Sequence, residues 1–297
     1  MSAALDRRLN VYRADLADIA LKDRVDAANY VAGEKRIVTV PALEMRDHPT
    51  RESSIGTQAL LGERVTVFEE REGLSWIQLE TDRYVGYVNS EALGHAAADP
   101  THIVTAPRTF VYETADLRSP VRMVCSMGNL LTLVGEETTR GTDYRLLYGG
   151  GAVVATHVET QPYRATDYVT VAGLFLNTPY LWGGRSGFGL DCSGLIQLSM
   201  AMCGAQVPRD TDMQEAGLGD KIDAGPDYGG LRRGDLVFWK GHVAIVEDNN
   251  NVIHASGHAM QVVREPLAQA IDRIARLYGP PITTRRPWSV SGLVGNI

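Results

Sequence analysis

The chain has 297 residues, of which 44% are hydrophobic and 22% charged, and its formal net charge is −7. This composition is typical of a folded globular protein and excludes disordered and collagen-like classes. The acidic balance argues against a nucleic-acid partner and against a polybasic membrane-binding surface. No apolar run reaches the roughly 18 residues of a membrane-spanning helix, and the charged N-terminus does not resemble a signal peptide. With only three cysteines, too few for a disulfide framework, we expect a cytoplasmic protein.

The first segment, residues 1–33, is expected to be helical. Its apolar side chains recur at steps of three and four residues, at Leu5, Leu9, Tyr12, Leu16 and Ile19. This spacing places them on one face of a helix. We expect that face to pack on the domain that follows.

An internal repeat comes next. Ile37-Val-Thr-Val-Pro41 returns 66 positions later as Ile103-Val-Thr-Ala-Pro107, and both copies contain short alternating runs broken by glycines. Such runs predict two small β-barrels, over 34–97 and 98–160. The first copy resembles the bacterial SH3-like domain through Gly62-Glu63-Arg64-Val65, Trp76 and Gly86-Tyr87-Val88. The second copy lacks the Trp, so its assignment depends on the repeat.

Residues 161–297 have a different organisation. Helices are expected over 166–176 and 195–202, and strands over 235–239, 242–246 and 252–254. Helices followed by strands indicate an α+β domain and not a doubly wound one. The whole chain is thus expected to be α+β, with a helical segment and two barrels before this last domain.

Cys192 is the candidate nucleophile. It follows Asp191, a favourable N-cap residue, at the start of a predicted helix. A helix N-terminus favours a thiolate, and its free N–H groups can hold an oxyanion. Cys125 and Cys203 lie in apolar surroundings and are expected to be buried, unreactive thiols.

A catalytic thiol needs a nearby imidazole, which in turn needs an orienting partner. Of the seven histidines, His242 and His254 lie in strand-like runs of the last domain, on either side of the turn signal Asp248-Asn-Asn-Asn251. A hairpin of this size can bring the two side chains together. A single exposed histidine would mean little, but two in this order complete a Cys-His-His set.

These motifs resemble the NlpC family of cell-wall cysteine endopeptidases, which have a compact papain-like fold. The resemblance covers about 162–279 and includes further motifs in family order: Thr178-Pro-Tyr-Leu-Trp-Gly-Gly184, Asp191-Cys-Ser-Gly-Leu195, Pro208-Arg-Asp-Thr211 with Gln214, Arg233-Gly-Asp-Leu-Val-Phe238, Gly241-His-Val-Ala-Ile245 and Ile253-His-Ala255. It implies that Cys192 is the nucleophile, His242 the general base and His254 the group that orients His242. It also implies that the Tyr180 hydroxyl helps to polarise the scissile carbonyl or to hold the oxyanion, although a purely packing role for this tyrosine stays open.

Two SH3-like domains before such a domain resemble the subgroup that cleaves short murein peptides between γ-D-glutamate and the diamino acid. In that subgroup the peptide carries a free N-terminal L-Ala. The resemblance implies that Asp210, Tyr87 and Glu52 bind this ammonium, although Tyr87 could be a barrel-core residue and Glu52 a solvated loop residue. Trp182, Ser193 and Thr211 correspond to positions that line the peptide pocket.

Other functions have weaker support in the sequence. No Cys/His spacing fits a zinc site, and the glycines at 183–189 lack the Gly-Lys-Ser/Thr ending of a phosphate loop. We therefore expect no metal, no cofactor and no obligate protein partner. Two alternatives remain open: an amidase or acyl transferase on the same fold, and a non-catalytic murein-binding protein. With tri- or tetrapeptides as substrates and no export signal, recycling of wall peptides in the cytoplasm is the expected role.

Overall fold

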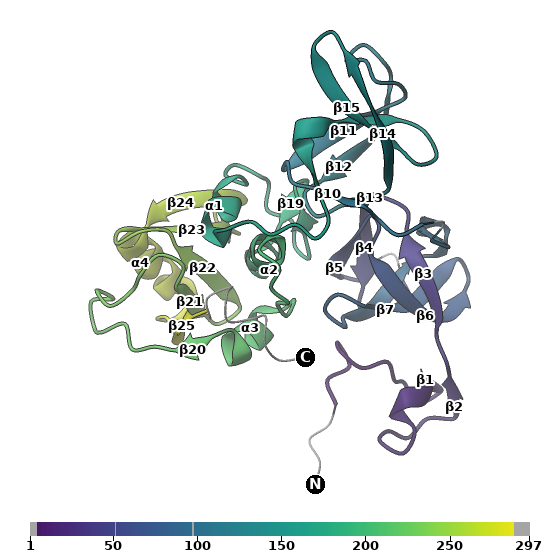
Figure 1. Ribbon diagram of the computed structural model, residues 1–297. Coiled ribbons are helices and arrows are strands. Elements are labelled where there is room, and N and C mark those ends of the chain that lie inside the picture. Colours follow the sequence, from purple (N-terminus) through teal and green to yellow (C-terminus); the bar gives the residue numbers. More distant parts are fainter. Residues whose placement is uncertain (1–4, 51, 97, 288–297) are drawn as a thin grey trace. The chain divides into compact units, whose positions relative to one another are not determined.

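The computed structural model describes residues 5–50, 52–96 and 98–287. The chain forms two compact units, Met1–Pro162 and Tyr163–Ile297 (Figure 1). Within the described ranges, no helix has the length and apolar character that crossing a membrane requires.

The helix expected over residues 1–33 is wrong for the described part of that segment. Residues 5–33 contain two short parallel strands, β1 (Leu16–Asp18) and β2 (Asn29–Val31), and the 3-10 turn η1 (Ile19–Leu21). The backbone is instead tied to the first barrel, where the Val85 N–H donates to Arg8 O at 2.8 Å and Gln78 Nε2 donates to Leu9 O at 2.8 Å. Val11 is buried in a cluster with Phe68, Trp76 and Val85. These tertiary contacts outweigh the helical spacing of the apolar residues.

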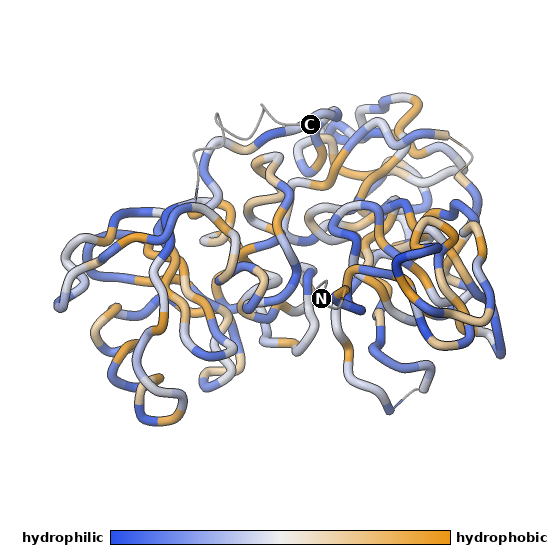
Figure 2. The backbone as a smooth tube through the Cα atoms, turned by 90° about the horizontal axis from the view of Figure 1, so that it is seen from below, coloured by the Kyte–Doolittle hydropathy of each residue, from blue (hydrophilic) through white to orange (hydrophobic). Residues whose placement is uncertain are grey.

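The first barrel is one seven-stranded sheet in the order β5-β4-β8-β7-β6-β3-β9. Its main core cluster includes Val38, Met45, Ile77 and Leu79. Figure 2 shows hydrophobic and hydrophilic residues interspersed along the whole backbone. The strands are β3 (Glu34–Val38), β4 (Ala42–Arg46), β5 (Ile55–Leu60), β6 (Arg64–Arg71), β7 (Leu74–Leu79), β8 (Val85–Asn89) and β9 (Leu93–Gly94), with the 3-10 turn η2 (Ser90–Ala92).

The second barrel repeats this strand order. Its five-stranded sheet runs β12-β11-β16-β15-β14, and a three-stranded sheet runs β13-β10-β17. Each strand of the first copy has a counterpart, except that the equivalent of β6 is divided into β13 and β14. The elements are β10 (His102–Val104), β11 (Arg108–Tyr112), β12 (Val121–Ser126), β13 (Leu130–Leu131), β14 (Leu133–Thr139), β15 (Thr142–Leu147), β16 (Ala152–Val154), η3 (Ala155–His157) and β17 (Val158–Thr160).

The second unit is built on a six-stranded antiparallel sheet in the order β20-β25-β21-β22-β23-β24 (Figure 1). Its central strands are apolar and almost fully buried, as expected for strands covered on both faces. They are β20 (Asp220–Lys221), β21 (Leu236–Trp239), β22 (His242–Val246), β23 (Asn251–Ser256), β24 (Gln261–Pro266) and β25 (Thr283–Arg286), and a separate hairpin joins β18 (Arg185–Ser186) to β19 (Gly189–Leu190).

Helices cover both faces of this sheet. The amphipathic helix α4 (Leu267–Tyr278) places Leu267, Ala270 and Ile274 in a cluster with Ala244 and Val252 of the sheet. The other face is covered by α1 (Tyr168–Gly173) and α2 (Cys192–Met202), which pack on each other, while α2 packs on β22 and β23. A fourth helix, α3 (Thr211–Gly217), packs against α2.

Candidate active site

Cys192 is the first residue of α2, and its side chain is 6% exposed. Asp191 caps the helix, because its Oδ1 accepts the Gly194 N–H at 2.7 Å and its Oδ2 accepts the Gly183 N–H at 2.9 Å. Gly194 has no room for a Cβ, which would collide with the Gly184 carbonyl oxygen. The glycines therefore allow the turn before β18 to pack closely against the start of the helix that carries the thiol.

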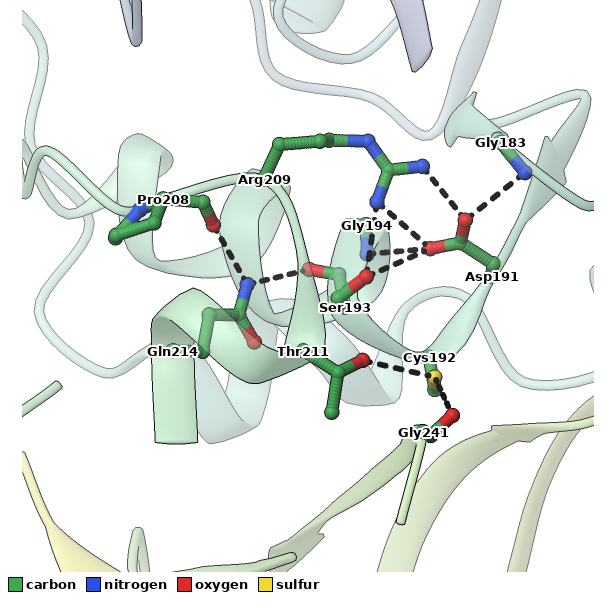
Figure 3. Close-up of polar contacts among 10 residues, drawn as sticks. All are labelled: Gly183, Asp191, Cys192, Ser193, Gly194, Pro208, Arg209, Thr211, Gln214 and Gly241. Atoms are coloured by element: carbon green, nitrogen blue, oxygen red, sulfur yellow. Dashed lines mark hydrogen bonds and ion pairs between the residues drawn. The ribbon is translucent and has the colours of Figure 1, made fainter. Parts of the chain in front are cut away.

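A buried arginine holds this cap in place. Arg209 is 1% exposed and donates from Nη2 to Asp191 Oδ2 at 2.6 Å and from Nη1 to Asp191 Oδ1 at 3.0 Å (Figure 3). Its Nη1 also donates to Ser193 Oγ at 2.9 Å, and Ser193 Oγ lies 3.3 Å from Asp191 Oδ1. The side-chain amide of Gln214 on α3 donates to Ser193 O at 3.0 Å and to Pro208 O at 2.8 Å. The loop before α3 is thus fastened to the first turn of α2.

The sulfur of Cys192 lies between α3 and the start of β22. The thiol donates to Gly241 O at 3.9 Å, and Thr211 Oγ1 lies 3.7 Å from Sγ, so the threonine hydroxyl is the donor of that pair (Figure 3). Burial and the nearby Asp191 carboxylate raise the pKa of Cys192 to about 11, and Thr211, the Val243 N–H and Arg209 lower it less. Burial of the thiol thus opposes the thiolate that a helix N-terminus favours.

The structure joins the two predicted histidines. His242 Nε2 lies 2.7 Å from His254 Nδ1, and the two rings meet edge to face. Strand pairing explains this contact: Val246 lies opposite Val252, so His242 and His254 fall on the same face of the sheet. Because Gly241 O and the Val243 N–H both contact Cys192 Sγ, the thiol lies against the backbone on either side of His242.

The two histidines differ in surroundings. His254 is 1% exposed and lies on the sheet face that α4 covers, whereas His242 stands at the start of β22 and is half-buried. Burial, followed by the neighbouring His254 and Arg273, lowers the pKa of His242 to about 3, while Glu265 opposes this shift. His242 is therefore a neutral imidazole at neutral pH, in the form that can accept a proton.

The other residues predicted in this unit are spread around the start of α2. Tyr180 is half-buried, and its pKa is raised by burial and then by the charges of Cys192 and Asp191, so its hydroxyl keeps its proton. Asp210 is half-buried at the N-cap of α3. Trp182 is 67% exposed. Thr211 contacts the sulfur itself, and the hydroxyl of Ser193 is engaged by Arg209.

The remaining two predicted residues lie in the first unit. Tyr87 on β8 stacks on Trp76 at 6.2 Å, and its hydroxyl accepts a hydrogen bond from Arg13 Nη1 at 2.9 Å. The Arg13 guanidinium also lies over the Trp76 ring at 4.2 Å and pairs with Glu69 at 2.8 Å. These residues line an open cavity of about 350 Å³. Glu52 is exposed in the loop between β4 and β5.

Sequence reasoning missed three residues of these two sites. Arg209 was noted only as part of a motif, yet it is the buried partner of Asp191. Glu265 accepts a hydrogen bond from His254 Nε2 at 2.6 Å, and the β-branched pair Val262-Val263 after the turn at 257–260 is the available signal for its strand. No sequence pattern pointed to Arg13, because the segment around it is expected to be helical.

Two family models match separate parts of the chain. Residues 45–93 match the family described as bacterial dipeptidyl-peptidase SH3 domain, and residues 177–275 match the NlpC/P60 family. A probable endopeptidase NlpC of Escherichia coli is 40% identical over 108 residues, which cover 31% of this chain and 67% of that protein.

Longer matches cover both units. A protein of Bacillus cereus named gamma-D-glutamyl-L-lysine dipeptidyl-peptidase is 28% identical over 239 residues, covering 69% of this chain and 68% of that protein. Dipeptidyl-peptidase 6 of Lysinibacillus sphaericus is 26% identical and covers 82% of this chain and 99% of that protein. A crystal structure of an NlpC/P60 family protein from Bacillus cereus superposes with a TM-score of 0.69 at 23% identity, over 86% of this chain and 99% of that one. This likeness confirms the expected fold class, an SH3-like part followed by a papain-like α+β domain.

Proposed function

This chain belongs to the NlpC/P60 family of cysteine peptidases, and we propose that it hydrolyses the γ-D-glutamyl bond to the diamino acid in short murein peptides with a free N-terminal L-Ala. One observation carries the proposal: a buried thiol at a helix start lies against the strand whose first residue, His242, is hydrogen-bonded to His254. The names of the relatives from Bacillus cereus and Lysinibacillus sphaericus support the choice of a dipeptide-releasing reaction.

The proposed chemistry uses the neutral thiol and the neutral imidazole together. As Cys192 Sγ attacks the γ-carbonyl carbon, His242 accepts the thiol proton. Because the pKa of His242 is low, its protonated form is stable only while the developing negative charge stays nearby. The carbonyl oxygen becomes an oxyanion, to which the protonated Tyr180 hydroxyl donates. His242 then protonates the leaving amine, and the thioester that remains is hydrolysed by water.

The proposal also names residues for substrate recognition. An N-terminal ammonium needs acidic or hydrogen-bonding partners to offset its lost hydration. We assign this role to Asp210, Tyr87 and Glu52; the Tyr87 oxygen, which accepts one hydrogen bond from Arg13, has a second lone pair to offer. Trp182, Ser193 and Thr211 are proposed to line the peptide pocket.

The domain limits and the cellular role are part of the same proposal. We assign the SH3-like domains to 34–97 and 98–160 and the peptidase domain to 161–297. A peptide that must carry a free L-Ala amine is a product of earlier cleavage and not intact wall polymer. A place in the cytoplasm, in the recycling of wall peptides, follows from that specificity.

The test is mass spectrometry of products from four peptides. L-Ala-γ-D-Glu-L-Lys and L-Ala-γ-D-Glu-diaminopimelate are each incubated with the protein, beside the same peptides with the L-Ala amine acetylated. The proposal predicts release of L-Ala-D-Glu from at least one free peptide and from neither acetylated one.

Each other outcome changes a defined part of the proposal. Cleavage of the acetylated peptides would keep the peptidase but remove the ammonium site and the recycling role. Transfer of the acyl group to an added amine in place of water would indicate an acyl transferase. Binding of the free peptide without any product would indicate a murein-binding protein.

A further inference from the structure

Glu265 adds a third group to the hydrogen-bonded pair of histidines. Its Oε1 lies 2.6 Å from His254 Nε2, and Arg273 of α4 donates to the same carboxylate oxygen. The register of β23 and β24 produces the contact: Val252 lies opposite Glu265 and His254 opposite Val263. Glu265 and His254 are therefore diagonal neighbours on one face of the sheet.

The carboxylate determines where the imidazole protons lie. An ionised carboxylate only accepts hydrogen bonds, so Nε2 of His254 carries a hydrogen. In neutral His254, Nδ1 is then an acceptor, and His242 Nε2, at 2.7 Å, must donate to it. His242 Nδ1 is left with its lone pair, which makes it the base available to the thiol.

The charge state of Glu265 is consistent with this pattern. Burial raises its pKa, but the hydrogen bonds from His254 and Arg273 lower it more, and the pKa ends below its ordinary value. Glu265 is 19% exposed on its side chain, so its negative charge acts on the histidines with little screening by water.

We propose that Glu265 is a positioning residue that fixes the tautomers of both histidines and favours the protonated form of His242 created when Cys192 loses its proton. It acts through His254 and touches neither the thiol nor the substrate. This inference rests on the roles proposed above for Cys192 and His242.

Arg273 provides a control that the structure itself supplies. Glu265 and Arg273 form one ion pair, so either substitution breaks the same link between β24 and α4. Their charges nevertheless act on His242 in opposite directions: Arg273 lowers its pKa, as His254 does, and Glu265 raises it. Near the thiol, Asp191 raises the pKa of Cys192 and Arg209 lowers it, and neither residue is altered by the test.

The experiment measures the rate of alkylation of Cys192 by iodoacetamide between pH 2 and pH 9, with the labelled peptide quantified by mass spectrometry. The full chain is used as wild type, Glu265→Gln and Arg273→Met. Cys125 and Cys203 are buried and serve as internal reporters of unfolding, because they react only when the fold opens. No substrate is needed, so failure of the proposed function would show up separately, as uncleaved peptide beside a normal alkylation profile.

We expect opposite shifts in the two variants. In Glu265→Gln the alkylation rate at neutral pH should fall about tenfold, since one unit of pKa is a tenfold change in the proton equilibrium. The acidic limb of the pH–rate profile should move down by about one pH unit. In Arg273→Met the acidic limb should move up in pH, with a rate at neutral pH equal to or above that of the wild type.

Two results would overturn the inference. Equal shifts in both variants would mean that the ion pair only supports the fold, and an unchanged pH profile in both would mean that Glu265 does not act on His242. If Glu265→Gln exposes Cys125 and Cys203 to the reagent, the Arg273→Met variant alone still tests the inference. It keeps the Glu265 carboxylate, so the acidic limb of its pH–rate profile must move to higher pH.

Discussion

Replacing Arg209 by Met should destabilise the second unit strongly although the substitution keeps a long apolar side chain. Arg209 is 1% exposed on its side chain and its partner Asp191 is 11% exposed, and two of its hydrogen bonds end on that carboxylate. Removing one partner of a buried ion pair costs about 3–5 kcal/mol, because the other charge is left without compensation. Asp191 would keep the Gly183 and Gly194 N–H groups, so we expect the lower end, about 3 kcal/mol.

This loss is measurable by calorimetry. For a domain of this size, about 3 kcal/mol corresponds to a fall in Tm of roughly 6–12 °C. Arg264→Met is the matched control, since Arg264 pairs with Glu247 in the same unit but is 48% exposed. An exposed pair contributes less than about 1 kcal/mol. If Arg209→Met melted within about 1 °C of this control, the buried pair would not be what holds the start of α2.

Three further outcomes are expected from single changes near the thiol. Thr211→Val removes the hydroxyl that donates to Cys192 Sγ and should slow alkylation of the thiol about 2- to 10-fold, whereas Thr211→Ser should keep the wild-type rate. Tyr180→Phe should lower kcat about 100-fold with little change in KM or Tm, and a Tyr180 that only packs would leave kcat unaffected. Because the pKa of His242 is about 3 in the folded chain, the unfolded chain binds the extra proton below about pH 6.5. The free energy of unfolding should therefore fall from pH 6.5 toward pH 3, less steeply in His242→Gln; an equal slope in both would contradict a buried neutral imidazole.

The parts of the site that sequence could predict are those set by local patterns. Asp191 before Cys192 predicts a capped helix, and the cap is present with the thiol on the first residue of α2. Alternation around the Asp248–Asn251 turn predicts a hairpin, and the hairpin brings His242 to His254. Each of these features depends on neighbours within a few residues or across one turn.

The parts that sequence could not predict depend on contacts between distant segments. The spacing of Leu9 and Leu16 predicts a helix, but hydrogen bonds to β7 and β8 hold that segment in an irregular path on the first barrel. Glu265 is one of 36 acidic residues in the chain, and only the register of β24 against β23 brings it to His254. The reactivity of Cys192 also depends on burial, which raises its pKa despite its place at a helix N-terminus.

The most direct test of the account compares wild type with Cys192→Ala on the same free L-Ala-γ-D-Glu-diamino acid peptide, with the products identified by mass spectrometry. We predict that the wild type releases L-Ala-D-Glu and the free diamino acid and that the folded variant releases neither. Release of L-Ala alone would mean that a different bond is cleaved. Product formation by the variant at the wild-type rate would show that the thiol is not the nucleophile.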